Sequence, residues 1–220
     1  MKTLFERQLL HLTAVALLVY AVYQLRNLPE FGLGGFLGIS TSSWVTLTIA
    51  VAIIHQVYVW FCWRTELEWK LLSQIMGRLA FVLYAAGFTV LIVLRPILIF
   101  ILGWSNRGSL PIDPILGYAV SAILVIPALY LMYSVKTYFG FRRAFGLDHF
   151  DPSVRDLPLV RHGIFRWSPN AMYVFGFMVL WVPAFLFQSL AALVVAAFSH
   201  IYIWVHFYVT ERPDMRRIYG

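Results

Sequence analysis

The chain has 220 residues, of which 61% are hydrophobic and 12% charged, and its formal net charge is +7. A soluble domain is usually about 45–50% apolar and about 25% charged. An apolar excess of this size cannot be hidden in one globular core, so the composition excludes an ordinary soluble domain and favours a membrane protein. The single cysteine, Cys62, excludes an intramolecular disulfide.

Apolar runs long enough to cross a bilayer, which takes about 20 residues, recur along the chain. They cover residues 8–25, 44–63, 79–102 and 115–135, and a longer block runs from 171 to 209. That last block exceeds one crossing, and Pro183 and Gln188 near its middle indicate a helical hairpin or two short spans. We therefore expect an all-α fold, a polytopic transmembrane helical bundle of five to six spans.

The Lys and Arg residues are distributed unevenly between the two ends of these spans. If the N-terminus is cytoplasmic and each span reverses direction, fourteen of the 17 fall on the cytoplasmic side, and only Arg26 and Arg107 fall on the other. This is the positive-inside pattern, so we expect a multi-pass protein of a bacterial inner membrane or the endoplasmic reticulum. The N-terminus, the polar loops and the C-terminus are then cytoplasmic. Because the basic charge follows topology, we expect no nucleic acid partner.

Arg95 is the basic residue that falls inside a predicted span. An arginine in the membrane interior needs a carboxylate, carbonyl groups or a water-filled cavity, unless its side chain extends to the interface. Extension toward the outer interface is the simpler interpretation.

Polar residues gather in the second half of the chain. Residues 136–170 mix aromatic side chains with Arg and Asp, and this mixture is too hydrophobic for a disordered linker. We expect a folded cytoplasmic segment with short amphipathic helices that lie against the membrane. The chain is then one integral domain, with residues 1–135 as a transmembrane scaffold and residues 136–220 as the cytoplasmic segment plus the C-terminal hairpin.

The end of the last apolar block carries polar residues at helical spacing. His200, Trp204, Phe207 and Glu211 follow one another at offsets of four, three and four, which places them on one face of a helix. His206 lies on a neighbouring face. These side chains either receive a polar ligand or anchor the helix at the level of the lipid headgroups, as interfacial aromatic residues do.

A Gly-, Pro- and Asn-rich turn precedes the same block, and a helix is expected to begin near Ala171 or Met172. The free N–H groups at a helix N-terminus suit a carboxylate or a phosphate. Asn170 is positioned to cap this helix, and Gly176 permits close approach of backbone or ligand one turn later. The alternative is a capped helix that simply enters the membrane, flanked by the interfacial residues Arg166 and Trp167.

The stretch GIFRWSPNAMYVFG, residues 163–176, resembles the G-x-Y-R-x-x-R-H-P-x-Y-x-G signature of integral-membrane methyltransferases. These include the isoprenylcysteine carboxyl methyltransferases and the phosphatidylethanolamine N-methyltransferases. The positions that keep the pattern include Gly163, Phe165, Arg166 and Tyr173. Asn170 stands where those enzymes often have His, and Ala171 stands where they have Pro.

The tail resembles the second signature of the same enzymes, E-E-x-x-L-x-x-x-F-G. Glu211, Met215, Tyr219 and Gly220 fall at the matching offsets, and Arg212 replaces the second glutamate. The resemblance covers about residues 160–220. It implies a pocket for S-adenosylmethionine (SAM) on the cytoplasmic side and a lipid substrate that enters from the bilayer.

By this resemblance, the cofactor pocket has two walls, one from each signature. The residues implied for it are Arg166, Asn170, Tyr173 and Gly176 on one wall, and His206 and Glu211 on the other. A sulfonium cation is attracted to aromatic faces, and Tyr173, Trp204 and Tyr208 supply such faces nearby. We expect no metal site.

The stretch FGLDHFDP supplies acid–base groups for such chemistry. A lipid amine must lose its proton before it accepts a methyl group, and His149 beside Asp148 is suited to accept that proton. Asp151 is suited to hold the substrate's ammonium group. The alternative is a local turn in which Asp148 or Asp151 accepts hydrogen bonds from nearby backbone N–H groups.

These residues together predict a membrane-embedded, SAM-dependent methyltransferase whose acceptor is a phosphatidylethanolamine-type amine. Arg142, Arg143 and Arg161 are the expected partners of the lipid phosphate. Three alternatives stay open: a prenylcysteine carboxyl methyltransferase, an NADPH-dependent sterol or steroid reductase of similar architecture, and a non-catalytic structural membrane protein.

Overall fold

The computed structural model describes residues 3–220, and these residues are almost entirely helical. Five helical segments are long and apolar enough to cross a membrane. Their principal helices are α1 (Gln8–Leu25), α3 (Thr41–Trp69), α5 (Ala80–Ser105), α6 (Pro114–Ser134) and α10 (Leu190–His206). The predicted all-α, multi-pass bundle is therefore confirmed.

Local capping chemistry sets where three of these helices begin. The Ser40 side chain accepts a hydrogen bond from the backbone N–H of Ser43 at the start of α3. Asp113 does the same for Leu116 at the start of α6. Ser189 caps α10 by accepting from Ala192. Each cap satisfies a backbone donor that the first helical turn leaves without a partner.

Short elements connect the spans at both ends of the bundle. After α1 come α2 (Pro29–Gly32) and a small antiparallel hairpin of β1 (Gly35–Phe36) and β2 (Ile39–Ser40). After α3, a short helix α4 (Leu71–Met76) and one 3₁₀ turn, η1 (Gly77–Leu79), lead into α5. The predicted second span, 44–63, is extended to Trp69, so Arg64 lies within a helix and not in a loop.

The polar segment after α6 is folded, as predicted, but its helices are very short. A π-helical turn, η2 (Val135–Phe139), continues α6, and α7 (Phe141–Ala144) follows a bend at Gly140. The remaining turns of this segment are η3 (Leu147–His149), η4 (Pro152–Val154) and η5 (Gly163–Arg166).

The last apolar block forms the predicted helical hairpin. Its first arm is broken into α8 (Ala171–Val174), η6 (Gly176–Leu180) and α9 (Val182–Leu186). The chain reverses at Gln188, whose φ of 46° is left-handed. The second arm continues from α10 through a π-helical turn, η7 (Phe207–Glu211), into α11 (Arg212–Tyr219).

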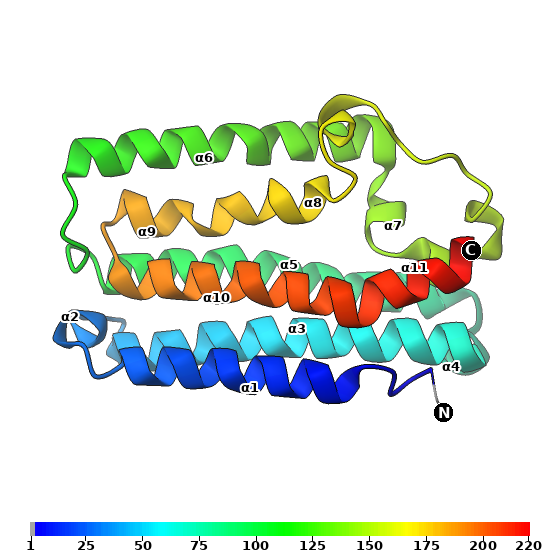
Figure 1. The fold of residues 1–220 in the computed structure, drawn as a ribbon, viewed down its shortest axis with the longest axis horizontal. Coiled ribbons are helices and arrows are strands. Elements are labelled where there is room, and N and C mark those ends of the chain that lie inside the picture. Colours follow the sequence, from blue (N-terminus) through cyan, green and yellow to red (C-terminus); the bar gives the residue numbers. More distant parts are fainter. Residues whose placement is uncertain (1–2) are drawn as a thin grey trace.

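The helices lie roughly antiparallel in layers (Figure 1). The broken arm α8–α9 lies between α6 and α10, and α3 and α1 lie on the opposite side of α10. Close packing of α10 depends on small side chains, since Ala191, Ala192 and Ala196 are fully buried. Both ends of the described chain, α4 and the segment after α6 lie at the same end of the bundle (Figure 1), where the basic residues are concentrated.

Candidate functional site

The two signature segments meet at a hydrogen bond. Tyr173 in α8 donates its hydroxyl to a carboxylate oxygen of Glu211 in η7, which is 38 residues away in sequence. The hairpin makes this contact possible, because α8 and the end of α10 run side by side in opposite directions. The structure thus brings together two of the predicted cofactor-binding residues.

Aromatic rings surround this hydrogen bond. The Tyr173 ring lies 5.9 Å from the Trp204 ring and 5.7 Å from the Phe207 ring, measured between centroids. Trp204 and Phe207 in turn pack edge to face at 5.7 Å. A carboxylate beside several aromatic faces is an environment that suits a cationic ligand with hydrogen-bond donors.

The same aromatic surface continues along α10. The His200 ring lies 5.7 Å from the Phe177 ring and accepts a hydrogen bond from Nε1 of Trp181 at 3.0 Å. The predicted common face of His200, Trp204, Phe207 and Glu211 is therefore confirmed, and it faces the broken arm of the hairpin. A hollow of about 160 Å³ lies on this face, lined by Trp181, Ala197, His200, Ile201 and Trp204.

Arg64 fixes the backbone that carries Glu211. Pro213 has no N–H group, so the carbonyl of Val209, four residues earlier, lacks its usual α-helical donor. Nη2 of Arg64 donates to this carbonyl at 2.8 Å, and Nη1 donates to the carbonyls of Thr3, Leu4 and Glu6. One buried side chain from α3 thereby ties the N-terminal segment to the turn between α10 and α11.

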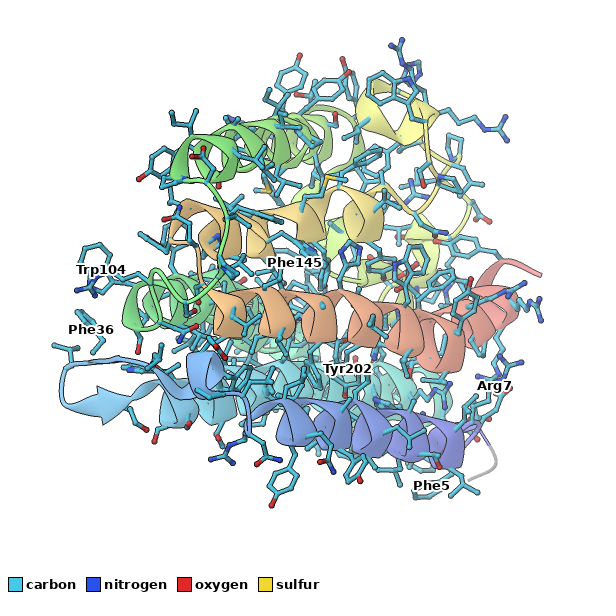
Figure 2. All side chains as sticks on the ribbon, turned by 60° about the vertical axis from the view of Figure 1, so that its left-hand side comes forward. Phe5, Arg7, Phe36, Trp104, Phe145 and Tyr202 are labelled. Carbon is cyan, nitrogen blue, oxygen red and sulfur yellow. The ribbon has the colours of Figure 1, made fainter. Side chains whose placement is uncertain are left out.

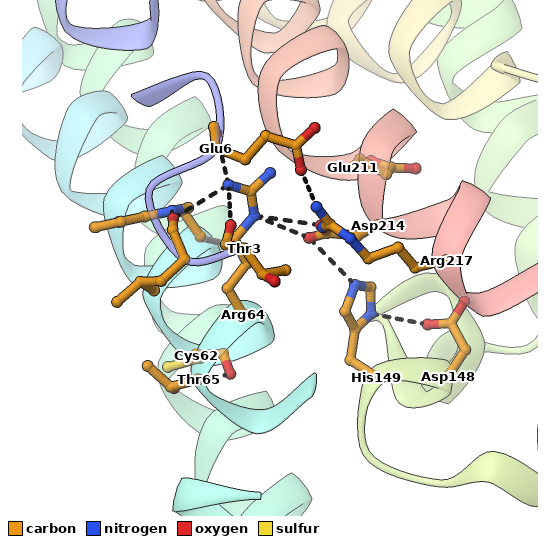
Figure 3. Close-up of polar contacts among 12 residues, drawn as sticks. Thr3, Glu6, Cys62, Arg64, Thr65, Asp148, His149, Glu211, Asp214 and Arg217 are labelled. Carbon is orange, nitrogen blue, oxygen red and sulfur yellow. Dashed lines mark hydrogen bonds and ion pairs between the residues drawn. The ribbon is translucent and has the colours of Figure 1, made fainter. Parts of the chain in front are cut away.

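Arg64 also begins a chain of charged groups (Figure 3). Its Nε lies 3.3 Å from Oδ1 of Asp214, and both side chains are fully buried. Nη1 of Arg217 donates to the same carboxylate at 2.9 Å. On the other side of Asp214, Nε2 of His149 approaches Oδ2 at 3.9 Å. The carboxylate of Asp214 therefore lies among three basic side chains.

The predicted pair Asp148 and His149 is a real contact. Nδ1 of His149 lies 3.1 Å from Oδ1 of Asp148, and the Tyr219 hydroxyl donates to Oδ2 at 3.0 Å. Burial by itself raises the pKa of Asp148, but the hydrogen bond and charge of His149 and the hydrogen bond from Tyr219 outweigh it and hold that pKa below its ordinary value. The His149 ring is fully buried and stacks on Trp63 at 4.2 Å.

Two of the predicted residues near the first signature occupy different surroundings from those expected. Arg166 is exposed and its guanidinium lies over the Trp167 ring at 5.0 Å. It forms no ion pair with Glu211 within the described part of the chain. Asn170 does precede α8, as predicted, but its side chain makes no capping hydrogen bond. The expected side-chain cap is therefore wrong.

Gly176 and His206 lie at the edges of this region. A Cβ atom on Gly176 would meet Cδ2 of Leu131 at 2.8 Å, so its close approach is to α6. His206 is buried on the other side of α10, with its ring 6.4 Å from His11 and 6.2 Å from Trp63. The structure does not bring His206 next to Tyr173.

The residues predicted to hold the lipid headgroup lie on the folded segment. Arg142 is exposed over the Phe81 ring at 5.4 Å, and Arg161 is exposed as well. Nη1 of Arg143 donates to the Pro158 carbonyl at 3.1 Å. Asp151 accepts hydrogen bonds from the backbone N–H and the hydroxyl of Ser153, which lower its pKa. For Asp151 the local-turn interpretation is confirmed, whereas Asp148 bonds to His149 and Tyr219.

Sequence reasoning missed Arg64, Asp214 and Trp63 as members of this network. Arg64 and Asp214 are 150 residues apart, and no spacing rule connects them. Tyr219 was recognised only as a matching position of the second signature. Its hydroxyl bonds to Asp148 and so links the tail to the folded segment.

Within residues 3–220, no three His, Cys, Asp or Glu side chains converge as a metal site requires.

Comparison with known proteins finds a family match for the C-terminal half of the chain. No curated protein and no solved structure is significantly similar to the chain. The family described as phospholipid methyltransferase matches residues 116–220, which include Tyr173, Glu211, Asp148 and His149. By that match, the C-terminal half of this multi-pass membrane protein is similar to the phospholipid methyltransferase family.

Proposed function

We propose that the protein transfers a methyl group from SAM to the amine of a phosphatidylethanolamine-type lipid. The observation that supports this most is the hydrogen bond between Tyr173 and Glu211, because it joins the two signature segments at one place. The family match covers both residues, and similarity to this family favours a methyltransferase with a lipid substrate. The choice of donor and of acceptor amine is our proposal.

The residues at the junction fit SAM. SAM supplies a methyl group on a positively charged sulfonium, which leaves as a neutral thioether once the methyl is transferred. The faces of Tyr173, Trp204 and Phe207 attract such a cation, by about 0.5–2 kcal/mol per contact. Glu211 accepts hydrogen bonds from hydroxyl or ammonium groups of the ligand. In this proposal Asn170 contributes to the wall formed by Tyr173, while Gly176 supports the packing of that wall.

His149 is suited to prepare the acceptor amine. An ammonium has no lone pair, so the amine must lose a proton before its nitrogen can attack the methyl group. Nδ1 of His149 is held by Asp148, and Nε2 has no hydrogen-bond partner among the described residues. The imidazole can take up the proton at Nε2, where the charges of Asp148 and Asp214 stabilise the resulting cation.

The lipid headgroup is proposed to bind along the folded segment. Arg142 and Arg161 present exposed guanidinium groups, and such groups recognise phosphate oxygens through paired hydrogen bonds. Arg143 and Asp151 are already engaged in local hydrogen bonds, so they contribute charge near the headgroup more than direct contacts.

The burial of His149 favours a second candidate acceptor, the carboxylate of a prenylcysteine. A carboxylate needs no base, and a histidine that stacks on Trp63 with no exposed surface is suited to a structural role. The variant His149→Ala separates the two: it abolishes methylation of an amine near neutral pH and leaves methylation of a carboxylate nearly unchanged.

Titration of the purified protein with SAM and with NADPH tests the proposal. We expect saturable binding of SAM that Glu211→Gln weakens, and no saturable binding of NADPH. Saturable NADPH binding without SAM binding would indicate a reductase. Binding of neither nucleotide by a folded protein would favour a non-catalytic role.

A further inference from the structure

Arg95 lies inside the bundle without a counter-ion. It belongs to α5 and its side chain is 3% exposed, so it does not extend to the outer interface as the sequence suggested. None of its three guanidinium nitrogens has a hydrogen-bond partner among residues 3–220. No carboxylate of the described chain pairs with it. Its one strong contact is with the Phe177 ring, 5.0 Å from the guanidinium carbon.

Two histidines on helices that pack against α5 also lack partners. Both ring nitrogens of His55 in α3 and both of His206 in α10 are buried without a hydrogen bond in the described structure. Both α3 and α10 pack against α5, the helix that carries Arg95. Tyr202, labelled in Figure 2, lies in the same interior, but its hydroxyl is bonded to Nε2 of His11 at 2.9 Å. Arg95, His55 and His206 are thus among the described residues with buried polar atoms that lack a partner.

The side chains of residues 3–220 leave the Arg95 guanidinium without a hydrogen-bond partner or counter-ion. A guanidinium stays charged in proteins and offers five N–H donors, and leaving it unpaired in a membrane interior is costly. The aromatic face of Phe177 offsets only part of that cost. Unpaired imidazoles add further N–H donors. A group of donors around one positive charge matches an oxyanion, that is, a carboxylate or a phosphate.

Phe177 connects Arg95 to the proposed site. Its ring lies 6.5 Å from the Tyr173 ring and 5.7 Å from the His200 ring. Tyr173 bonds to Glu211, so Arg95 lies behind the aromatic wall of the region where we place the methyl donor and the lipid. Phe177 therefore contacts both Arg95 and the aromatic rings of the proposed site.

We propose that Arg95, assisted by His55 and His206, binds an oxyanion of a ligand of this enzyme. Two ligands carry one: the methyl donor has a carboxylate on its amino-acid end, and the acceptor lipid has a phosphate. This inference rests on the proposed function, because both ligands are those of the methyl transfer. It adds a binding site to which Arg95 and His55 contribute from outside the region that matches the family, and His206 from within it.

The test compares ligands that differ only in the oxyanion, using the wild type, Arg95→Met and Arg95→Lys in detergent. The first arm measures the binding of SAM and of decarboxylated SAM, which lacks the carboxylate. The second arm measures the KM for phosphatidylethanolamine and for a long-chain amine without phosphate, at saturating SAM. Arg107→Met is the matched control, since Arg107 also lies on an aromatic ring, Trp104, but is exposed.

If the carboxylate is bound, the wild type prefers SAM over decarboxylated SAM at least 10-fold, and Arg95→Met removes this preference. If the phosphate is bound, SAM binding is unchanged and Arg95→Met raises the KM for the phospholipid at least 10-fold, with no effect on the phosphate-free amine. Arg95→Lys keeps the positive charge, so it retains part of the wild-type preference for SAM in the first case and part of the wild-type KM for the phospholipid in the second. The control Arg107→Met leaves all four values as in the wild type.

The inference is overturned if folded Arg95→Met binds both donors and uses both acceptors as the wild type does. If Arg95→Met does not fold, the measurements on the wild type decide the question. The inference is then overturned if the wild type binds the two donors with equal affinity and has equal KM values for the two acceptors. A folded wild type that binds neither donor contradicts the proposed function itself, which is a different outcome from an unaffected Arg95 variant.

Discussion

Glu211 is the residue on which the proposed site depends most. Its carboxylate is held by the Tyr173 hydroxyl, and aromatic rings cover the surrounding surface. Arg212, which replaces the second glutamate of the signature, does not take part: its guanidinium is exposed over the Tyr208 ring at 5.6 Å. The proposed site therefore has one carboxylate at the place where the signature has two.

Substitution of this pair tests the site directly. Glu211→Gln replaces one acceptor oxygen of the carboxyl group with an N–H donor, a change worth about 1–3 kcal/mol, so we expect SAM affinity to fall about 10- to 100-fold. Tyr173→Phe removes one neutral donor and is expected to weaken binding about 2- to 10-fold. Tyr138→Phe, which changes an exposed tyrosine outside the site, is the control. Unchanged binding by Glu211→Gln, measured by calorimetry, would contradict the assignment.

The acid–base pair gives a prediction about pH. The pKa of Asp148 is lowered in the folded protein, so its ionised form stabilises the fold above its unfolded pKa of about 3.9, and this contribution is lost as the pH falls through the folded value. We expect Asp148→Asn to lower the melting temperature near pH 7. The difference from the wild type should shrink as the pH falls below about 4.

Thermal unfolding in detergent between pH 7 and pH 3 measures this difference. Asp156→Asn, a change at an exposed aspartate on the same segment, should leave the melting temperature close to the wild-type value. An Asp148→Asn variant as stable as the wild type at pH 7 would show that the contacts with His149 and Tyr219 do not stabilise the folded segment.

At the scale of elements, the turn between α10 and α11 is held in place by a side chain of another helix, Arg64 of α3. Pro213 removes a backbone donor, and Arg64 on α3 supplies a replacement for Val209 while it pairs with Asp214. This arrangement ties the position of Glu211 to α3 and to the N-terminal segment. A change in α3, far from the family-matched residues, should therefore reach the proposed site.

We expect Arg64→Met to destabilise the protein by about 3–5 kcal/mol, because it leaves Asp214 buried without its main partner. The double variant Arg64→Met with Asp214→Leu should recover part of this loss, since no unpaired charge then remains. SAM affinity should fall in the single variant. Arg216→Met, on the exposed face of α11, is the control, and equal melting temperatures of single and double variants would exclude the pairing as the cause.

Two glycines offer a matched test of how η3 is positioned. Gly146 and Gly140 both have positive φ, 83° and 86°, so alanine strains the backbone at either position. A Cβ atom on Gly146 would collide with the Trp63 ring, whereas nothing lies within 4 Å of one on Gly140. We expect Gly146→Ala to displace Trp63, and with it His149, and to reduce methyl transfer.

Gly140→Ala should show only the backbone strain, as a modest fall in melting temperature. Comparing the initial rates of the two variants at a temperature where both are folded isolates the steric effect at Trp63. Equal rates would mean that the stacking of Trp63 on His149 has no influence on the reaction.

The elements were more predictable from sequence than the site. Hydropathy alone placed the first span at 8–25, where α1 lies, and Gln188 marked the reversal of the hairpin. Tyr173 and Glu211 were found because each belongs to a recognisable pattern. The sequence predicts that the second span ends at residue 63, just before Arg64, because a charge at the end of an apolar run looks like the end of a span. Its partner Asp214 is 150 residues away in sequence. Pairings of this kind depend on tertiary packing.

The whole molecule consists of a bundle of apolar helices with polar segments gathered at one of its ends. The described N-terminal segment, the C-terminus and the folded segment after α6 lie at one end of the bundle (Figure 1), and most of the basic residues lie there too. By the positive-inside rule we place this end in the cytoplasm. In the proposed reaction, a soluble methyl donor would reach Glu211 from the water side, and a lipid acceptor would approach the same region from the bilayer.

Lipid mass spectrometry of host membranes is the most direct test of methyl transfer by the whole protein. Cells that express the wild type should accumulate phosphatidylethanolamine carrying one or more added methyl groups, and cells that express Glu211→Gln at the same level should not. Methyl groups on another lipid class would correct the acceptor. Lipid profiles identical with and without folded wild-type protein would contradict the account.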